Sequence, residues 1–287
     1  RQDSFVYHNL ILPYEPSIGA HFNCEQFVSK GITTIDPPPQ RVKSGGGNMV
    51  PNVRYFAKDK LPHYIDRGLR YYCATLSELA LQVRCGREML VSRAAKRLNL
   101  FFDKICIDEF QDFREHHYDL IVKLSKALNN VTLVGDYYQH SVSGQNNHGK
   151  PFAKGKVKIE YKEFLEKLKK EGFEIDEKSL CVSRRCAPAV CLFVSEKLGI
   201  QIISSGHSEG KVILIDEDPS AILLDDSITK LVYSNSDSYT FPSMNWSYSK
   251  GDTMESVCVI LTDKLEKLPE DGFSTKGLSC STINRLY

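Results

Sequence analysis

The residues best suited to chemistry lie in one short string, where an apolar segment runs directly into acids. Ile105–Ile107 is followed at once by Asp108 and Glu109, and Gln111 and Asp112 come directly afterwards. Adjacent carboxylates at the tip of a strand can hold Mg²⁺ and activate a water molecule for attack on a phosphate. The string therefore predicts nucleotide hydrolysis.

A second polar segment follows the next apolar run along the chain. Val131–Val134 is aliphatic or β-branched throughout and leads into Gly135–Gln139. Buried parallel strands have this composition, and ligand-contacting groups gather at their carboxyl ends. Residues 117–128 carry apolar side chains at helical spacing, which predicts a crossover helix between the two strands. A strand, helix and strand in this order require a parallel sheet.

Four segments resemble motifs II to V of the UvrD/Rep-like superfamily 1 DNA helicases, in the order that the family has them. They are Asp108–Asp112, Gly135–Gln139, Ser183–Cys186 and Ser249–Thr253. The resemblance implies an α/β fold with two RecA-like parallel-sheet domains of the phosphate-loop NTPase type. It also implies an ATP-dependent DNA helicase, with ATP and Mg²⁺ as cofactors, that moves 3′ to 5′ on single-stranded DNA.

The family's motif I, a phosphate loop of the form G-x-x-x-x-G-K-[ST], has no match before Asp108. The nearest string, Gly144–Lys150, lies downstream and is followed by Pro151 instead of a hydroxyl residue, so we interpret it as a loop. Asn284–Tyr287 resembles the opening of motif VI without its later Arg. We therefore expect an internal fragment of a compact helicase, with an incomplete first domain, that is inactive on its own.

The resemblance assigns catalytic roles to four residues. Asp108 would hold Mg²⁺, and Glu109 would orient and deprotonate the water that attacks the γ-phosphate. Gln139 matches the γ-phosphate sensor, and Arg185 matches the second-domain Arg that reaches the same phosphate. Arg184 is adjacent, so this assignment could shift by one position. Each residue also has a purely structural alternative. Asp108 and Glu109 could be an exposed strand end, Gln139 could cap a turn through its amide, and Arg185 could form a surface ion pair.

Lys250 and Gly251 would lie in the motif V loop, where nucleotide and DNA contacts are shared. An ordinary turn is the alternative, because Thr253 stands where the larger enzymes carry Glu.

Candidate DNA contacts lie at two places in the chain. Ser4 and Phe5 resemble the segment after motif Ia, near the DNA backbone, although a packing role would also explain them. Trp246 and Tyr248 precede motif V and could stack on bases, although a lone Trp between strands is more often part of a core. The basic stretch 150–170 could also bind single-stranded DNA, but we favour a solvated helix with its apolar side chains turned inward.

The expected domain organisation has a first RecA-like domain over residues 1–178 and a second over 179–287. A small helical segment, at about residues 30–100, would be inserted in the first domain. Within it, the Pro- and Gly-rich residues 32–55 predict a surface loop, and residues 75–81 and 89–98 predict helices.

In the second domain, a helix should begin at Pro188. Lys211–Ile215 and Val257–Leu261 predict strands, the latter buried, and Ala221–Val232 predicts a helix or a helix and a strand.

The composition is that of an ordinary globular protein, with 287 residues, a net charge of +1 and 41% hydrophobic residues. No membrane span or signal peptide is predicted. The nine cysteines form no zinc pattern; Cys106 and Cys258 should be buried, and His116 and His117 should lie at the surface. Reduced thiols fit a cytoplasmic protein.

Two further functional expectations follow from the resemblance. A nuclease or a defence or repair protein is a possible partner, by analogy with compact relatives. The alternative function is a degenerate helicase-like module that binds DNA or protein without hydrolysing ATP. A phosphate-loop ATPase that is not a helicase fits less well, because Arg185 and the loop at Lys250 match helicase motifs.

Overall fold

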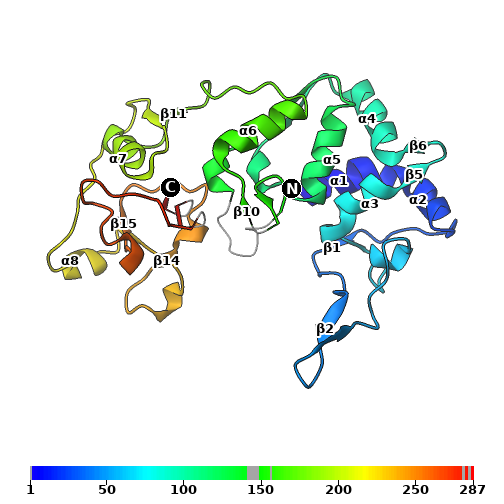
Figure 1. The fold of residues 1–287 in the computed structure, drawn as a ribbon, viewed down its shortest axis with the longest axis horizontal. Helices are drawn as coiled ribbons and strands as arrows, with labels where there is room; N and C mark the ends of the chain where they lie inside the picture. Colours follow the sequence, from blue (N-terminus) through cyan, green and yellow to red (C-terminus); the bar gives the residue numbers. More distant parts are fainter. Residues whose placement is uncertain (1, 141–148, 156, 280–281, 284–285) are drawn as a thin grey trace. The chain divides into compact units, whose positions relative to one another are not determined.

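A computed structural model describes residues 2–140, 149–155, 157–279, 282–283 and 286–287. The chain forms two compact units, unit 1 over residues 1–135 and unit 2 over residues 136–287 (Figure 1). The boundary expected at residue 178 separates two domains that were defined by the family motifs, and it stays a prediction. The Gly144–Lys150 string and the Asn284–Tyr287 segment fall largely outside the described residues.

Unit 1 is mainly helical. Its helices are α1 (Gln2–Val6), α2 (Glu15–His21), α3 (Leu76–Gln82), α4 (Leu90–Phe101) and α5 (His116–Ser125), with a π-helical turn at Tyr7–Ile11. Shorter 3-10 turns lie at Leu12–Tyr14, Leu61–His63, Cys73–Thr75 and Phe110–Asp112. The helices predicted from residues 75–81, 89–98 and 117–128 are confirmed as α3, α4 and α5. In α4, for example, Leu90, Ala94 and Leu98 recur every four residues and are all buried.

The strands of unit 1 pair locally. β1 (Ile32–Thr33) is parallel to β4 (Tyr71–Tyr72), and β7 (Ile105–Ile107) is parallel to β8 (Val131–Leu133). Two hairpins pair β2 (Arg41–Lys43) with β3 (Met49–Pro51) and β5 (Arg84–Cys85) with β6 (Glu88–Met89). The parallel β7–α5–β8 unit confirms the topology predicted from the two apolar runs.

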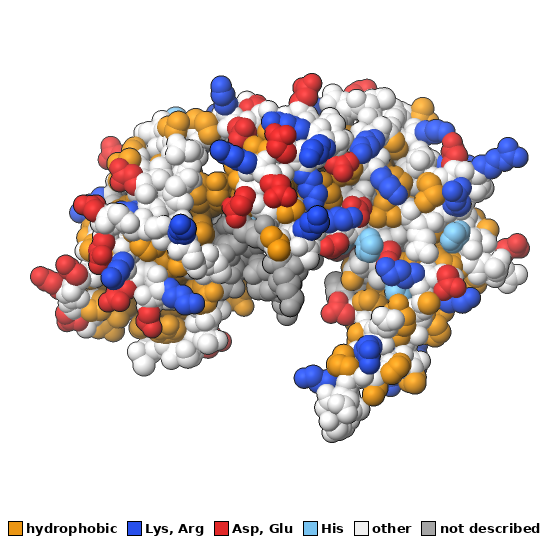
Figure 2. All heavy atoms as spheres, viewed as in Figure 1, with side chains coloured by type: hydrophobic (Ala, Val, Ile, Leu, Met, Phe, Trp, Pro, Cys, Tyr) orange, Lys and Arg blue, Asp and Glu red, His pale blue; other side chains and the backbone are white. Residues whose placement is uncertain are grey.

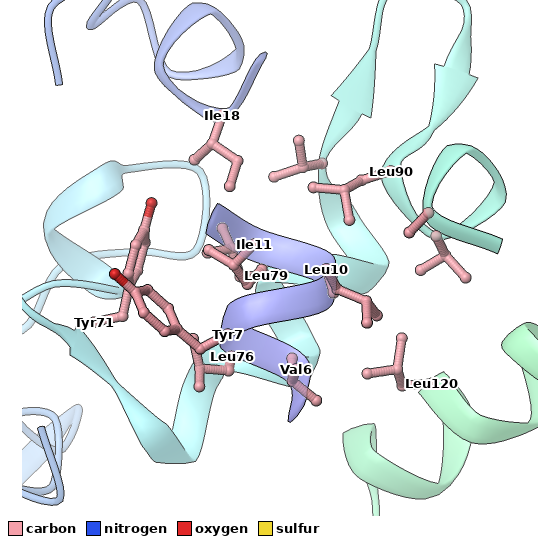
Figure 3. Close-up of a cluster of buried hydrophobic side chains, with 14 of the residues drawn as sticks. Val6, Tyr7, Leu10, Ile11, Ile18, Tyr71, Leu76, Leu79, Leu90 and Leu120 are labelled. Atoms are coloured by element: carbon pink, nitrogen blue, oxygen red, sulfur yellow. The ribbon is translucent and has the colours of Figure 1, made fainter. Parts of the chain in front are cut away.

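The core of unit 1 lies among its helices. Leu10, Ile11, Leu76, Leu79 and Leu90 are almost fully buried and pack together, with Tyr71 closing one side (Figure 3). The strands β7 and β8 contribute no residue to this cluster. The β7–β8 pair therefore lies outside this core cluster.

The described residues of unit 2 form short helices and three small sheets. Its helices are α6 (Tyr161–Lys170), α7 (Pro188–Leu198) and α8 (Ser220–Leu223), with 3-10 turns at Tyr137–Gln139, Ser236–Ser238, Trp246–Tyr248 and Asp263–Leu265. Its strands are β9 (Ala153–Lys154), β10 (Val157–Lys158), β11 (Val182–Ser183), β12 (Ile203–Ser204), β13 (Thr229–Val232), β14 (Met244–Asn245) and β15 (Val257–Val259). β9 and β10 are antiparallel, whereas β11–β12 and the β14–β13–β15 sheet are parallel. The described chain thus has the mixed α/β content and parallel pairing that the sequence predicts.

Several predicted elements of unit 2 are present. α7 begins at Pro188, where the missing N–H costs nothing, and is followed by Gly199 with a φ of 69°. Residues 221–232 form a helix and a strand. In α6, Phe164 and Leu168 are buried while Lys162, Lys169 and Lys170 are exposed, which agrees with the solvated-helix interpretation for this part of the basic stretch.

Several predictions about individual segments and residues were wrong in whole or in part. Residues 34–55 lie at the surface, as predicted, but they contain the β2–β3 hairpin instead of only a loop, because the Gly-rich Ser44–Asn48 segment closes a turn between two short strands. Lys211–Ile215 forms no strand; its apolar side chains are exposed and its backbone has no ladder partner. β15 is an edge strand with Val257 41% exposed, and not buried.

Further errors concern the single residues Cys106, Cys258 and His117. Cys106 is exposed, because β7 and β8 stand alone and one face of this pair is not covered, and Cys258 is only half-buried. His117 is half-buried and lies against Ser77 of α3, so it is not a surface residue. No helix of the described residues is long and apolar enough to cross a membrane.

Candidate functional site

The acid pair lies at the carboxyl end of β7, at an exposed turn. β7 and β8 pair with Ile107 opposite Leu133, so both strands end at the same edge. The Val134 N–H donates to the Ile107 carbonyl and the Phe110 N–H donates to the Val134 carbonyl, each at 2.8 Å. These bonds fix the turn that carries Asp108 and Glu109 to the end of β8.

The two acids are held in distinct ways. Oδ1 of Asp108 accepts the Glu109 N–H at 2.8 Å, which leaves Oδ2 for another ligand. Glu109 has a φ of 52° and a ψ of 40°, a left-handed backbone that Glu rarely adopts. Its carboxylate accepts a hydrogen bond from the Gln111 side-chain amide. Both acids are exposed, whereas Gln111 is only 2% exposed, so a buried amide positions an exposed carboxylate.

Gly135 completes this arrangement from the end of β8. A Cβ atom at this position would lie 2.7 Å from Oε1 of Gln111 and 3.1 Å from the backbone nitrogen of Phe110. Only glycine allows β8 to approach so closely. The sequence analysis assigned no role to Gln111 or Gly135. The position of Gly135 directly after an apolar strand could have indicated that the backbone makes a close contact there.

In unit 2, Gln139 is held by Asp136. The Asp136 carboxylate accepts the Tyr138 N–H at 2.9 Å and the Gln139 side-chain amide at 3.2 Å. Asp136 thereby caps the turn Tyr137–Gln139, and Gln139 is half-buried. Burial, followed by the Asp136 charge, raises the pKa of Tyr138 above its ordinary value.

Arg185 and the loop at 249–253 are brought together in unit 2. Nη1 of Arg185 donates to the Asp252 carbonyl at 3.0 Å, across 67 positions of sequence. The Arg185 N–H is in turn anchored to the Ser183 hydroxyl at the end of β11. Gly251 has a φ of 89°, which a side chain would disfavour, so a tight turn at this point requires glycine. The segments resembling motifs IV and V are therefore in contact.

The candidate DNA contacts differ in exposure. Trp246 is 2% exposed and its indole N–H donates to the Leu231 carbonyl at 3.0 Å, which favours the core alternative at this position. Tyr248 is 69% exposed. On α1, Phe5 is 37% exposed and Ser4 is half-buried. DNA binding by these residues stays a prediction.

The acid-bearing turn and the β7–α5–β8 unit fall within one matched segment of the chain. Residues 59–141 match the family model of the UvrD/REP helicase N-terminal domain. The match supports a UvrD-like helicase relationship, and it includes both Asp108–Asp112 and Gly135–Gln139. The chain has no match among curated proteins.

Proposed function

We propose that this chain carries the ATP-hydrolysing core of a UvrD-like DNA helicase, a translocase that moves 3′ to 5′ on single-stranded DNA. The observation that carries the proposal is the exposed acid pair at the tip of β7, inside the UvrD-like segment and fastened to the end of β8. Two RecA-like domains with a boundary near residue 178 are part of this proposal, as is a cytoplasmic location. A nuclease or a defence or repair protein is the proposed partner.

The donor set suits Mg²⁺ delivered with a nucleotide. Mg²⁺ commonly keeps several waters and takes one or two carboxylates together with substrate phosphates. Among the described residues, no group of three or more His, Cys, Asp or Glu side chains could hold a metal ion. Asp108 is an exposed carboxylate with Oδ1 bound to the Glu109 N–H, and a single carboxylate of this kind is enough for a Mg²⁺ ion that is also held by ATP phosphates. The bound Mg²⁺ would neutralise charge on the phosphates.

Glu109 is proposed as the general base for the attacking water. Its carboxylate is exposed, so water can reach it, and it is oriented by a hydrogen bond from the Gln111 side-chain amide. Gln111 acts as a positioning residue. The left-handed backbone at Glu109 turns the carboxylate away from the direction that a continuing strand would give it.

Two further residues are proposed to sense the γ-phosphate. Gln139, held by Asp136, is proposed as the sensor, and Arg185 is proposed to reach the same phosphate. Because Arg185 also binds the Asp252 carbonyl, a change at the phosphate would be transmitted to the loop of Lys250 and Gly251. That loop is proposed to contact both nucleotide and DNA, and Ser4, Phe5 and Tyr248 are proposed as further DNA contacts.

The test is ATP turnover with and without single-stranded DNA, comparing the chain with Glu109→Gln. Removing a general base should lower DNA-stimulated turnover by about 100-fold or more, while DNA binding is retained. Glu25→Gln, an exposed acid of unit 1, is the matched control and should leave turnover unchanged. Undiminished turnover in Glu109→Gln refutes the assigned role. No turnover in the unaltered chain is the outcome expected if the chain is inactive on its own, and it does not by itself separate the two functions. DNA binding that is unaffected by ATP and Mg²⁺ would then favour the alternative, a helicase-like binding module.

A further inference from the structure

The β2–β3 hairpin and its flanks form an ordered projection that adds nothing to the core. Within residues 34–60, which we call the projection, no residue is buried. Figure 1 shows the hairpin extending away from the helices of unit 1. An isolated two-stranded hairpin is marginally stable in water. Its order must therefore come from its attachment to unit 1.

The attachment is made by polar groups at the base of the projection. The Tyr64 hydroxyl and the Gln82 side-chain amide both donate to the Lys58 carbonyl, at 2.9 and 3.2 Å. His63 Nδ1 lies 2.7 Å from the Phe56 carbonyl oxygen. Tyr64 is fully buried, so these bonds tie the base of the projection to a fixed part of unit 1. The hairpin is presented to solvent by a rigid support.

The projection is basic. It contains five Lys or Arg residues and two Asp residues, and blue Lys and Arg side chains are visible on it in Figure 2. Arg41 and Lys43 alternate with Val42, so both cations lie on one face of β2, while Val42 pairs with Val50 on the other. Lys43 and Arg54 are exposed and have no ion pair within the described part of the chain. These two cations are available to a partner.

We propose that the projection binds duplex DNA through the phosphate backbone, independently of base sequence. A two-stranded β-ribbon fits the major groove, which is about 12 Å wide. Cations beside it would pair with phosphates and release counterions. The Gly-rich segment Ser44–Asn48 lets the backbone of the tip approach closely. The inference rests on the proposed function and adds a duplex site to the proposed single-strand contacts.

The experiment compares two double variants of equal charge in the complete chain, without ATP. Lys43→Gln with Arg54→Gln removes the unpaired cations of the projection, and Arg87→Gln with Lys123→Gln removes two exposed cations elsewhere in unit 1. Binding to a blunt 20-base-pair duplex and to a single strand of the same length is followed by fluorescence anisotropy at several salt concentrations. Circular dichroism checks that both variants are folded.

The projection variant should bind the duplex at least about fivefold more weakly at low salt. Its plot of log affinity against log salt should be shallower by about 2, one unit for each phosphate contact. The control variant should match the unaltered chain. If the two variants bind the duplex equally, the projection serves a protein partner or none, and the inference fails. It also fails if only single-strand binding is weakened.

These results are separable from the proposed function. Duplex binding is measured without nucleotide, and Glu109→Gln should retain it. Loss of duplex binding in the projection variant supports the inference even if the chain shows no ATP turnover. Turnover that depends on Glu109, with duplex binding that does not depend on Lys43 and Arg54, supports the proposed function and overturns the inference.

Discussion

At the scale of single residues, Gly135 and Gln111 determine the position of the Glu109 carboxylate. Gln111 is buried, so its amide cannot move freely, and Gly135 leaves just enough space for it. Asp108 and Glu109 were predictable because adjacent acids after an apolar strand are a known signal. The left-handed backbone of Glu109 and its bond to Gln111 were not, because neither has a local sequence signature.

A methyl group at Gly135 tests this arrangement. Gly135→Ala should displace the Gln111 amide and lower the free energy of unfolding by about 1–3 kcal/mol, the usual cost of overpacking. Urea unfolding followed by circular dichroism measures the change. The control is Gly45→Ala, where an added Cβ would meet no atom within 4 Å and should change stability little. Equal stability of Gly135→Ala and the unaltered chain contradicts the close approach.

At the scale of elements, α3 and α5 are joined by a polar contact inside the helical body. Ser77 Oγ of α3 and His117 Nδ1 of α5 lie 2.8 Å apart, and Ser77 is fully buried. Burial lowers the pKa of His117 below its ordinary value of 6.5. Glu78, the next residue of α3, is also buried, and burial raises its pKa. Hydrogen bonding from Lys58 and the charge of His116 outweigh burial and hold the pKa below its ordinary value of 4.5.

The stability of unit 1 should therefore fall as the pH drops from 7.5 to 5.5. Between the lowered pKa of His117 and 6.5, the unfolded chain binds more protons than the folded one, so acid favours unfolding. Glu78 contributes stability above 4.5 that is lost only at lower pH. His117→Gln should flatten the dependence, measured by urea unfolding at the two pH values. His21→Gln, an exposed control, should not; an unchanged slope in His117→Gln contradicts the assignment.

The elements that the sequence predicted best are those with a complete local pattern. α3, α4 and α5 have apolar residues at helical spacing, and α7 has Pro188 at its start and Gly199 after its end. β7 and β8 are short apolar runs that lead into turns. Lys211–Ile215 has an equally good strand pattern but no ladder, because pairing depends on a neighbour that the pattern does not specify. The β2–β3 hairpin was not predicted, because the many Pro and Gly residues in and around it are typical of loops.

At the scale of the whole molecule, the buried side chains of the described residues gather in separate clusters within each unit. A large cluster lies in unit 1, and in unit 2 clusters lie around Leu198, around Trp246 and among the contacting rings of Tyr137, Phe152 and Phe164. The sequence predicted enough apolar residues for two cores and did not predict how they are divided among these clusters. The assignment of each apolar side chain depends on packing between distant segments, such as Trp246 against Leu231.

A truncation in the large core should be costly. Leu79 is fully buried in α3, so Leu79→Ala should lower the free energy of unfolding of unit 1 by about 2–5 kcal/mol. Circular dichroism during urea unfolding measures the loss. Leu100→Ala in α4 is the control, because Leu100 is 81% exposed and its truncation should change stability by less than about 0.5 kcal/mol. Equal losses in the two variants would contradict the described core.

The left-handed backbone at Glu109 has a consequence for protein engineering. A non-glycine residue held in this region costs on the order of 1–3 kcal/mol, and the cost falls at the residue proposed to activate water. A stability-guided redesign would favour glycine or asparagine at position 109 and would discard the carboxylate. Thermostable variants of this chain selected by melting temperature alone would tend to lose the proposed base, so such a selection needs an activity screen beside it.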